Sequence, residues 1–299
     1  MPKRKNRRKC LRENKLIKKA AGHRPDVSTP TTGQTLWIKP HWVELAQVEL
    51  QLPALPEVFM GKRIVQISDV HVSSTVSHEY LWGCIELINQ LEPDMVFLTG
   101  DYVTYDVRGH YKKKAVELLG EIHSRQGVFA CLGNHDYGVI RGFRPVRQKQ
   151  LDYLIAGMQK HEISVLRNLS CAVEIDGQRL WLVGMGDLWG QDFHPVKAFD
   201  RVPADEAAIA LVHNPACMEY LHGFTADVVI SGHTHGGQVN IPFWGPANQY
   251  HAGWFNFGEK KLYVNRGLGR IGWSPTGRLP EITVFTLNKG NDTAKDSAA

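Results

Sequence analysis

The stretch Val128-Phe129-Ala130-Cys131-Leu132-Gly133-Asn134-His135-Asp136 passes from five apolar residues directly to a glycine and three polar residues. An apolar run of this length is typical of a buried β-strand. An amide, an imidazole and a carboxylate just beyond it need partners that a packed core does not offer. Gly, Asn and Asp are also common turn formers, so the tetrapeptide alone is equally compatible with an ordinary turn. Its meaning depends on the rest of the chain.

The same pattern occurs twice upstream. The apolar run at 64–67 leads to Asp69 and His71, and the run at 95–99 leads to Asp101. Apolar residues at helical spacing follow all three runs, over 81–91, 115–122 and 151–158. Three strand–helix units in succession predict a mostly parallel sheet covered by helices. In such a sheet, polar groups at the carboxyl ends of neighbouring strands meet at one rim.

The second half of the chain has shorter predicted strands, and Asp176-Gly177 between two of them predicts a hairpin turn. We expect strands at 163–166, 171–175, 180–183, 209–212, 228–230, 262–264 and 282–287, and one or two more over 37–50. This half is expected to be more antiparallel than the first. No flexible linker separates the halves, which favours two sheets packed face to face in one domain with helices outside.

Five strand ends carry side chains of the kinds that bind metals. These are Asp69 with His71, Asp101, Asn134 with His135 and Asp136, His213, and His233 with His235. A single such residue is usually a hydrogen-bonded turn residue, but five ends together favour a metal centre. Side chains at positions i and i+2 share one face of a strand. Asp69 and His71 are therefore expected to bind one ion if the extended geometry persists, and so are His233 and His235.

The blocks Asp-x-His, Gly-Asp, Gly-Asn-His-Asp, a separate His and Gly-His-Thr-His, in this order, resemble the calcineurin-like metallophosphoesterases from about residue 62 to 285. The resemblance implies an α/β fold, a four-layer αββα sandwich of two mixed sheets flanked by helices. It also implies two divalent metal ions. Asp69, His71 and His235 would bind one ion, Asn134, His213 and His233 the other, and Asp101 would bridge them.

The resemblance further implies a metal-bridging hydroxide that attacks phosphorus, with His135 protonating the leaving group and Asp136 orienting the His135 ring. Mixed imidazole and oxygen ligands suit Mn, Fe or Zn. One departure from the family pattern is Thr104, where many members have Asp or Asn three residues after the Gly-Asp aspartate. Asp106 is the expected replacement for that interaction.

The basicity of the chain lies in its first residues. Ten of the 35 Lys and Arg residues and one of the 30 acids lie in 1–19, so the remainder is mildly acidic. A run of like charge usually indicates a solvated, disordered segment. Its functional alternative is attachment of residues 3–19 to an anionic membrane. We expect a basic, disordered tail and linker over 1–34, one metallophosphoesterase domain over 35–288 and a frayed C-terminus over 289–299.

No apolar run approaches the roughly 20 residues needed to span a bilayer, and no apolar segment follows the basic residues as in a secretory signal. We expect a cytoplasmic protein, with peripheral attachment to the inner membrane as the alternative. The five cysteines are scattered, which argues against a disulfide framework or a zinc ribbon. Cys84 and Cys131 lie in apolar patterns and are expected in the core.

The segments between the motifs suggest a substrate. Aromatic residues after the Gly-His-Thr-His block, among them Trp244, are either core residues or an apolar wall for a ligand. Arg266, Arg270 and Arg278 are either solvated or placed to bind a second phosphate. The Gly-His-Thr-His-Gly-Gly-Gln-Val and Val-Asn-Arg-Gly-Leu-Gly blocks resemble the bacterial subgroup that includes the YkuE and YaeI types. That resemblance implies a phosphodiester or pyrophosphate substrate, with lipid-linked UDP-diacylglucosamine, from lipid A synthesis, as one candidate.

Two alternatives stay open. A nuclease of the same fold would use the basic tail, but the mildly acidic remainder offers no obvious track for a nucleic acid backbone, so nucleic acid is the less favoured partner. A non-catalytic scaffold of the same fold would not need the complete ligand set together with His135. The oligomeric state is not predicted by these patterns.

Overall fold

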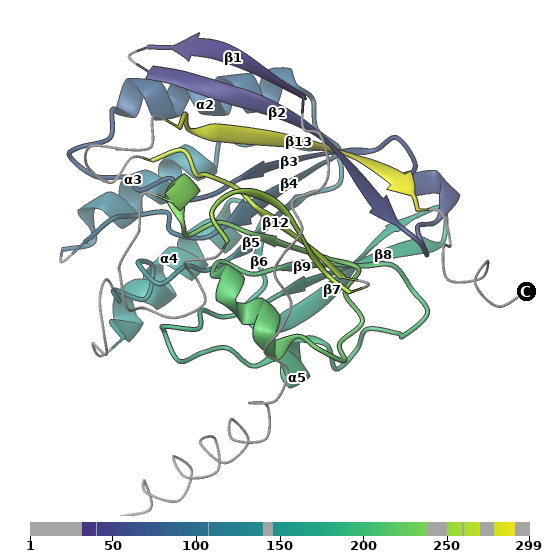
Figure 1. Cartoon of the computed structure of the whole chain (residues 1–299). Coiled ribbons are helices and arrows are strands. Elements are labelled where there is room, and N and C mark those ends of the chain that lie inside the picture. Colours follow the sequence, from purple (N-terminus) through teal and green to yellow (C-terminus); the bar gives the residue numbers. More distant parts are fainter. Residues whose placement is uncertain are drawn as a thin grey trace, which may run out of the picture.

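The computed structural model describes residues 32–39, 41–106, 108–139, 146–237, 250–258, 260–269 and 278–290. These residues form two β-sheets with helices on their outer faces (Figure 1). The predicted α/β fold with two mixed sheets is confirmed.

The first sheet has seven strands in the order β1-β2-β13-β3-β4-β5-β6. They are β1 (Thr32–Ile38), β2 (His41–Leu52), β13 (Glu281–Lys289), β3 (Arg63–Ile67), β4 (Met95–Thr99), β5 (Val128–Cys131) and β6 (Ile163–Val165). Strands β3 to β6 are parallel, which was predicted for β3, β4 and β5. Strand β13 is antiparallel to β3 and parallel to β2, while β1 is the antiparallel edge strand. The turn between β1 and β2 therefore lies at the same rim as the carboxyl ends of β3, β4 and β5.

The second sheet has six strands in the order β11-β12-β10-β9-β8-β7. They are β7 (Leu169–Ile175), β8 (Gln178–Gly184), β9 (Ala208–Leu211), β10 (Val228–Ser231), β11 (Gly253–Phe257) and β12 (Lys260–Val264). The central four strands are parallel, and only the edge strands β7 and β11 are antiparallel to their neighbours. The predicted hairpin turn at Asp176-Gly177 joins β7 and β8, with both residues at positive φ.

The second sheet is more antiparallel than the run of strands β3 to β6, as expected, but only through its edge strands β7 and β11; its four central strands are parallel because long connections return each strand in the same direction. Two other details differ from the sequence expectation. Strand β6 pairs with β5 and belongs to the first sheet. Strand β11 was not predicted, because its aromatic residues were assigned to loops; Trp254 and Phe255 are buried in the core.

Three helices cover the outer face of the first sheet. They are α2 (His78–Gln90), α3 (His110–Leu119) and α4 (Gln148–Lys160). Each presents its apolar residues, spaced three or four positions apart, to a core cluster shared with the sheet. Helix α2 begins where Ser77 accepts a hydrogen bond from the backbone N–H of Tyr80, which is an ordinary N-cap.

A second apolar cluster fills the space between the two sheets, and a third covers the outer face of the second sheet. The outer layer there is thin, consisting of α5 (Pro195–Ala198) and the 3₁₀ turn η2 (Pro215–Tyr220). Two further 3₁₀ turns are η1 (Glu57–Phe59) and η3 (His235–Gly237). Cys84 and Cys131 are buried in these cores as free thiols, as predicted.

The expected tail and linker over 1–34 and the frayed end over 289–299 lie mostly outside the described residues. Strand β1 begins at Thr32, so the last residues expected in the linker already belong to the sheet, and β13 extends to Lys289. Within the described part of the chain, no helix is both long and apolar enough to cross a membrane.

Candidate metal centre

The predicted metal ligands meet at one rim of the molecule, just beyond the carboxyl ends of β3, β4, β5, β9 and β10. They are Asp69 and His71 after β3, Asp101 after β4, Asn134 after β5, His213 after β9, and His233 and His235 after β10. All seven side chains are buried, none more than 7% exposed. Both sheets contribute, so the two halves of the chain are needed to form the site.

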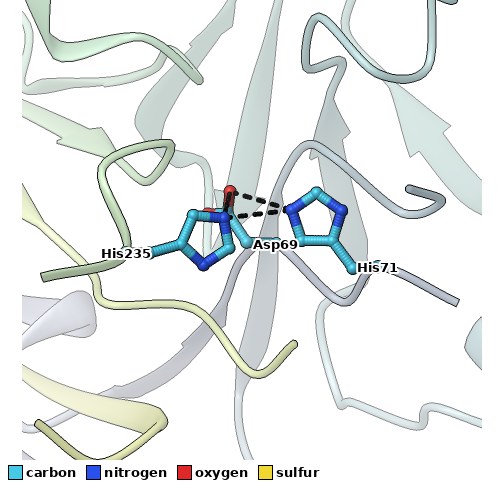
Figure 2. A group of neighbouring side chains, drawn as sticks. All are labelled: Asp69, His71 and His235. Carbon is cyan, nitrogen blue, oxygen red and sulfur yellow. Dashed lines mark hydrogen bonds and ion pairs between the residues drawn. The ribbon is translucent and has the colours of Figure 1, made fainter. Parts of the chain in front are cut away.

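The first group consists of Asp69, His71 and His235, whose polar atoms point toward a common centre (Figure 2). Oδ1 of Asp69 lies 3.2 Å from Nε2 of His235 and 3.8 Å from Nε2 of His71. The two imidazole nitrogens are 3.0 Å apart. Oδ1 of Asp69 is buried and has no hydrogen-bond partner among the described residues. This arrangement fits a cation held between the three atoms, because a metal ion would satisfy all of them at once.

The second group consists of Asp101, His213 and His233. Nε2 of His213 lies 3.2 Å from Nδ1 of His233 and 3.1 Å from Oδ2 of Asp101. The other ring nitrogen of His213, Nδ1, is 2.7 Å from the carbonyl oxygen of Thr99. A carbonyl can only accept, so Nδ1 donates, and Nε2 faces the group.

Asp101 connects the two groups. Its Oδ2 faces His213 of the second group and lies 3.9 Å from Nε2 of His71 in the first. Its Oδ1 accepts a hydrogen bond of 2.8 Å from the backbone N–H of His135, which fixes the carboxylate. The position of Oδ2 between the two groups is the position expected of a carboxylate shared by two ions.

Asn134 offers a neutral oxygen. Its amide nitrogen donates to the carbonyl of Val139 at 2.6 Å, which identifies the other amide atom as Oδ1. That oxygen is buried without a hydrogen-bond partner among the described residues. A buried amide oxygen without a hydrogen-bond partner, at the end of the strand next to β4, fits the predicted role of a metal ligand.

The backbone at the ligands is not extended, contrary to the sequence expectation. Asp69, His71, Asp101, His233 and His235 all have positive φ values between 48° and 76°. This left-handed conformation is uncommon outside glycine, although Asp and His adopt it more readily than most residues. The side chains therefore converge because each strand turns sharply at its end, and not because they share one face of a strand. Local strain of this kind is common at functional sites.

Close packing of the backbone holds the first group in place. Oδ2 of Asp69 accepts hydrogen bonds from Ser68 Oγ at 2.6 Å and from the backbone N–H of His233 at 2.9 Å, which ties β3 to β10. Gly232 lies against this pair, and a Cβ at Gly232 would be 1.9 Å from Ser68 Oγ. Glycine is required here by space rather than by its conformation.

The expected role of Asp136 was wrong. Its carboxylate does not orient the His135 ring; instead, it accepts hydrogen bonds of 2.9–3.0 Å from the backbone N–H groups of Asp101, Tyr102 and Gly133. The carboxylate thus joins the ends of β4 and β5 and positions the ligands that follow them. Burial, together with the charge of Asp101, raises the pKa of Asp136 to about 7.

The His135 ring is held by the main chain at Thr104. Its Nδ1 is hydrogen-bonded to the Thr104 carbonyl oxygen, so Nδ1 carries a proton. Nε2 faces the centre at 3.9 Å from Oδ2 of Asp101. The replacement expected from Asp106 is not seen, because its carboxylate accepts backbone N–H bonds at the start of α3. Although Thr104 replaces the Asp or Asn of the family pattern, its backbone carbonyl still provides His135 with a hydrogen-bond partner. A backbone carbonyl is present at every residue, so the sequence does not reveal this contact.

The electrostatics favour a positive charge at the centre. Burial alone would lower the pKa of His213, yet the carboxylates of Asp101 and Asp69 raise it to about 10. The pKa values of His71 and His233 are lowered to about 3 by burial and by the neighbouring histidines. Two carboxylates that stabilise a cation beside neutral imidazoles are what a divalent metal ion requires of its ligands.

Comparison with known proteins agrees with this geometry. The model of the calcineurin-like phosphoesterase family matches residues 62–237, which include all seven predicted ligands. The chain belongs to the calcineurin-like phosphoesterases. As a member of this family, it is a metal-dependent phosphoesterase with two buried His/Asp groups.

Relatives of this phosphoesterase are similar over most of their length. The chain is 31% identical to the uncharacterized metallophosphoesterase YkuE of Bacillus subtilis, covering 87% of this chain and 90% of YkuE. It is 30% identical to the UDP-2,3-diacylglucosamine pyrophosphatase LpxG of Chlamydia muridarum, covering 79% and 86%. It is 29% identical to the phosphodiesterase YaeI of Escherichia coli, covering 85% and 92%.

Of the residues expected to bind substrate, the structure describes some and not others. Trp244 and Arg270 lie outside the described residues. The guanidinium of Arg266 forms ion pairs with Glu281 at 2.6 Å and Glu44 at 2.9 Å, so it is already engaged by two carboxylates. This pairing argues against direct phosphate binding by Arg266. The exposed Arg278, by contrast, packs against Gly236, next to the predicted ligand His235.

The aromatic residues near the metal centre were only partly foreseen. The ring of Trp189 lies edge-on to the His233 ring, with their centroids 4.6 Å apart. Trp189 follows Asp187, which is buried and belongs to the loop after β8. In the sequence, Trp189 and Phe193 follow the Gly-Asp pair at 186–187, and they were expected to be either core residues or part of an apolar wall for a ligand.

Proposed function

We propose that this phosphoesterase hydrolyses a phosphodiester or pyrophosphate bond at a centre of two divalent ions held by Asp69, His71, His235, Asn134, His213, His233 and the bridging Asp101. The observation that carries the proposal is the position of His135. Its side chain is 10% exposed, whereas five of the six Asp and His residues proposed as ligands are at most 2% exposed: Asp69, His71, Asp101, His213 and His235. A proton-carrying group at the mouth of a buried metal site is what a hydrolase needs and a scaffold does not.

The chemistry divides between the ions and the side chains. When bound, two divalent ions supply Lewis acidity toward the phosphoryl oxygens and lower the pKa of water. The protein holds His135 with Nδ1 against the Thr104 carbonyl and Nε2 toward the site. When His135 is protonated, Nε2 can donate its proton to the oxygen of the leaving group. Asp136 is a positioning residue, because it fixes the backbone between Gly133 and Asp101.

The proposed ligands indicate which metal ions bind, and the residues near them indicate which kind of phosphate bond is cleaved. Imidazole and oxygen ligands together favour Mn, Fe or Zn over Mg or Ca. The exposed Arg278 beside Gly236 is placed to bind a second phosphate, which would favour a pyrophosphate or a phosphorylated ester. Among the relatives, LpxG is a UDP-2,3-diacylglucosamine pyrophosphatase, and we propose a lipid-linked substrate of this kind.

We place the protein in the cytoplasm, at the inner membrane where such substrates lie. The ten basic residues of the first 19 supply an attraction to anionic lipid. A nuclease activity is the second candidate, and its support is the same run of basic residues.

A hydrolysis panel in Mn²⁺ tests the proposal. The substrates are bis-p-nitrophenyl phosphate, p-nitrophenyl phosphate, UDP-2,3-diacylglucosamine and single-stranded DNA, each with wild type and with Asp101→Asn. We expect the diester and the UDP-lipid to be cleaved faster than the monoester and DNA, and each rate to fall in the variant. Faster cleavage of DNA than of the other substrates would favour the nuclease over this proposal. Activity that is unchanged in Asp101→Asn would have to come from a contaminating enzyme.

A further inference from the structure

Lys112 is a buried lysine in the first turn of α3. It is 2% exposed, and among the residues that the structure describes it is the only Lys or Arg that is buried. An ammonium group is seldom placed in the interior without a specific partner, because its burial without hydrogen bonds is costly. The partner lies in the turn that carries His135, where Nζ of Lys112 donates a 2.8 Å hydrogen bond to the backbone carbonyl of Asp136.

This carbonyl differs from its neighbours in the turn. No backbone N–H in the described part of the chain donates to it, so the ammonium of Lys112 takes that place. Since Asp136 is fully buried, the carbonyl would lose its partner without regaining water if the ammonium were removed. Four other carbonyls of the turn accept backbone N–H bonds of 2.9–3.2 Å: Gly133 from Asp136, Asn134 from Val139, His135 from Gly138 and Tyr137 from Arg147.

The bond from Lys112 is the third contact between His135 and the segment that follows β4. Oδ1 of Asp101 accepts the backbone N–H of His135 at 2.8 Å, and the carbonyl of Thr104 holds Nδ1 of the ring. The same segment places Lys112, because the Asp106 carboxylate accepts the backbone N–H of Lys112 at 2.7 Å. The carbonyl bonded by Lys112 belongs to the next residue after His135, so this contact fixes the main chain on the far side of the imidazole.

We propose that Lys112 is a positioning residue for His135, whose hydrogen bond to the Asp136 carbonyl keeps Nε2 of His135 directed at the oxygen of the leaving group. The inference rests on the proton-donor role proposed above. Nε2 lies 3.9 Å from Oδ2 of Asp101, and proton transfer requires that donor and acceptor come within hydrogen-bond reach. A displacement of about 1 Å is enough to lose much of the rate.

A purely structural role for Lys112 is the alternative, because the loss of a buried hydrogen bond weakens any fold. The two roles differ in their dependence on the leaving group. A proton donor matters for phenol, which is a poor leaving group, and matters little for p-nitrophenol, which is stable as an anion. A loss of stability lowers the amount of active protein, so it lowers the rates for both esters equally.

Hydrolysis of diphenyl phosphate and bis-p-nitrophenyl phosphate by the full-length protein in Mn²⁺ separates these roles. In Lys112→Met we expect kcat to fall about tenfold for diphenyl phosphate and less than about twofold for bis-p-nitrophenyl phosphate, with the metal content unchanged. Lys114→Met is the matched control, an exposed lysine on the same helix. Val116→Ala is a second control, since it removes buried methyl groups of α3 that pack toward α4. Neither control should change the ratio of the two rates.

A double-variant cycle tests whether Lys112 acts through His135. In the His135→Gln background, Lys112→Met should change kcat for diphenyl phosphate by less than about twofold, because the group that it positions is gone. Equal fold-losses in the two backgrounds would overturn the inference. So would equal losses for both esters, or unchanged rates in Lys112→Met.

Amide hydrogen exchange follows the turn without relying on activity. The N–H groups of His135, Gly138 and Val139 are hydrogen-bonded in the turn, and we expect them to exchange on the order of tenfold faster in Lys112→Met. Exchange in β4 and α4 should stay at the wild-type rate. Wild-type protein that cleaves no phosphate ester would overturn the proposed hydrolysis, whereas unchanged exchange of the turn in an active enzyme would overturn the role of Lys112 alone.

Discussion

Oδ2 of Asp101 lies 3.1 Å from Nε2 of His213, across the gap between the two sheets. The carboxylate follows β4 of the first sheet and the imidazole follows β9 of the second. The contact exists only because the carboxyl ends of both sheets open on the same rim. It makes the metal centre a consequence of how the sheets pack, and it makes Asp101 the residue on which both metal groups depend.

Asp101→Asn should lose most of the second metal ion and most of the activity. The amide keeps a similar shape but removes the negative charge that holds a cation beside His213. We expect the metal content to fall from about two ions toward one, and the rate by more than about 100-fold. Elemental analysis and hydrolysis of bis-p-nitrophenyl phosphate measure both. Asp205→Asn, in an exposed loop, is the control and should leave both unchanged.

His135→Gln should retain the metal ions and lose rate. The side chain meets the site through Nε2 and donates no buried ligand atom to either group. We expect kcat to fall on the order of 10²–10⁴-fold for an ester with an alkyl leaving group, which needs a proton to depart. The loss should be smaller for a p-nitrophenyl ester, because that leaving group is stable as an anion. Equal losses for both esters would show that His135 does not act as the proton donor.

Gly232→Ala should weaken the metal site by displacing Asp69. The added methyl group would lie 2.4 Å from Asp69 Oδ2 and closer still to Ser68 Oγ, so these groups have to move. We expect a loss of about 1–3 kcal/mol in the free energy of unfolding, together with weaker metal binding. Chemical denaturation and metal titration measure the two effects.

The control for Gly232→Ala is Gly223→Ala. Gly223 has a φ of 84° and no atom within 4 Å of its added Cβ, so the change strains the backbone without a clash. We expect it to lower the free energy of unfolding by about 1 kcal/mol and to leave metal binding intact. Normal metal binding in Gly232→Ala would mean that Asp69 tolerates the displacement.

The convergence of the His and Asp residues into two buried groups was largely predictable from the sequence, because these residues come from short motifs at strand ends. Strands of four or five apolar residues, such as β4 and β5, are delimited by the glycine and polar residues that follow them. The geometry of those ends was not predictable. The alternation of side chains between the two faces of a strand does not apply to residues such as Asp69 and His71, which follow the strand and have positive φ.

The residues that support the site were mostly missed for a different reason. Thr99 and Thr104 hold His213 and His135 through backbone carbonyls, and every residue has such a carbonyl. Asp136 was recognised as part of the site, but its partners are backbone N–H groups rather than the adjacent imidazole. Contacts made by the main chain leave no pattern in side-chain types, so they appear only in the structure.

Asp187 should make the metal-free protein less stable as the pH rises from about 4 to about 6. Burial, with a contribution from the charge of Asp101, raises its pKa from 3.8 to about 6. Within this window the unfolded chain releases the proton while the folded protein keeps it. Deprotonation therefore favours unfolding, and the loss stops once the pH exceeds the folded-state pKa. Two pKa units correspond to about 3 kcal/mol.

Asp187→Asn isolates this effect. The Asn oxygen can still accept the 2.7 Å hydrogen bond from the backbone N–H of Gly190, but the side chain no longer titrates. In the presence of EDTA, other groups titrate alike in both proteins and cancel in their difference. We expect the free energy of unfolding of the variant to gain about 3 kcal/mol relative to wild type between pH 4 and pH 7. A difference that does not change with pH would show that Asp187 is already ionised in the folded protein.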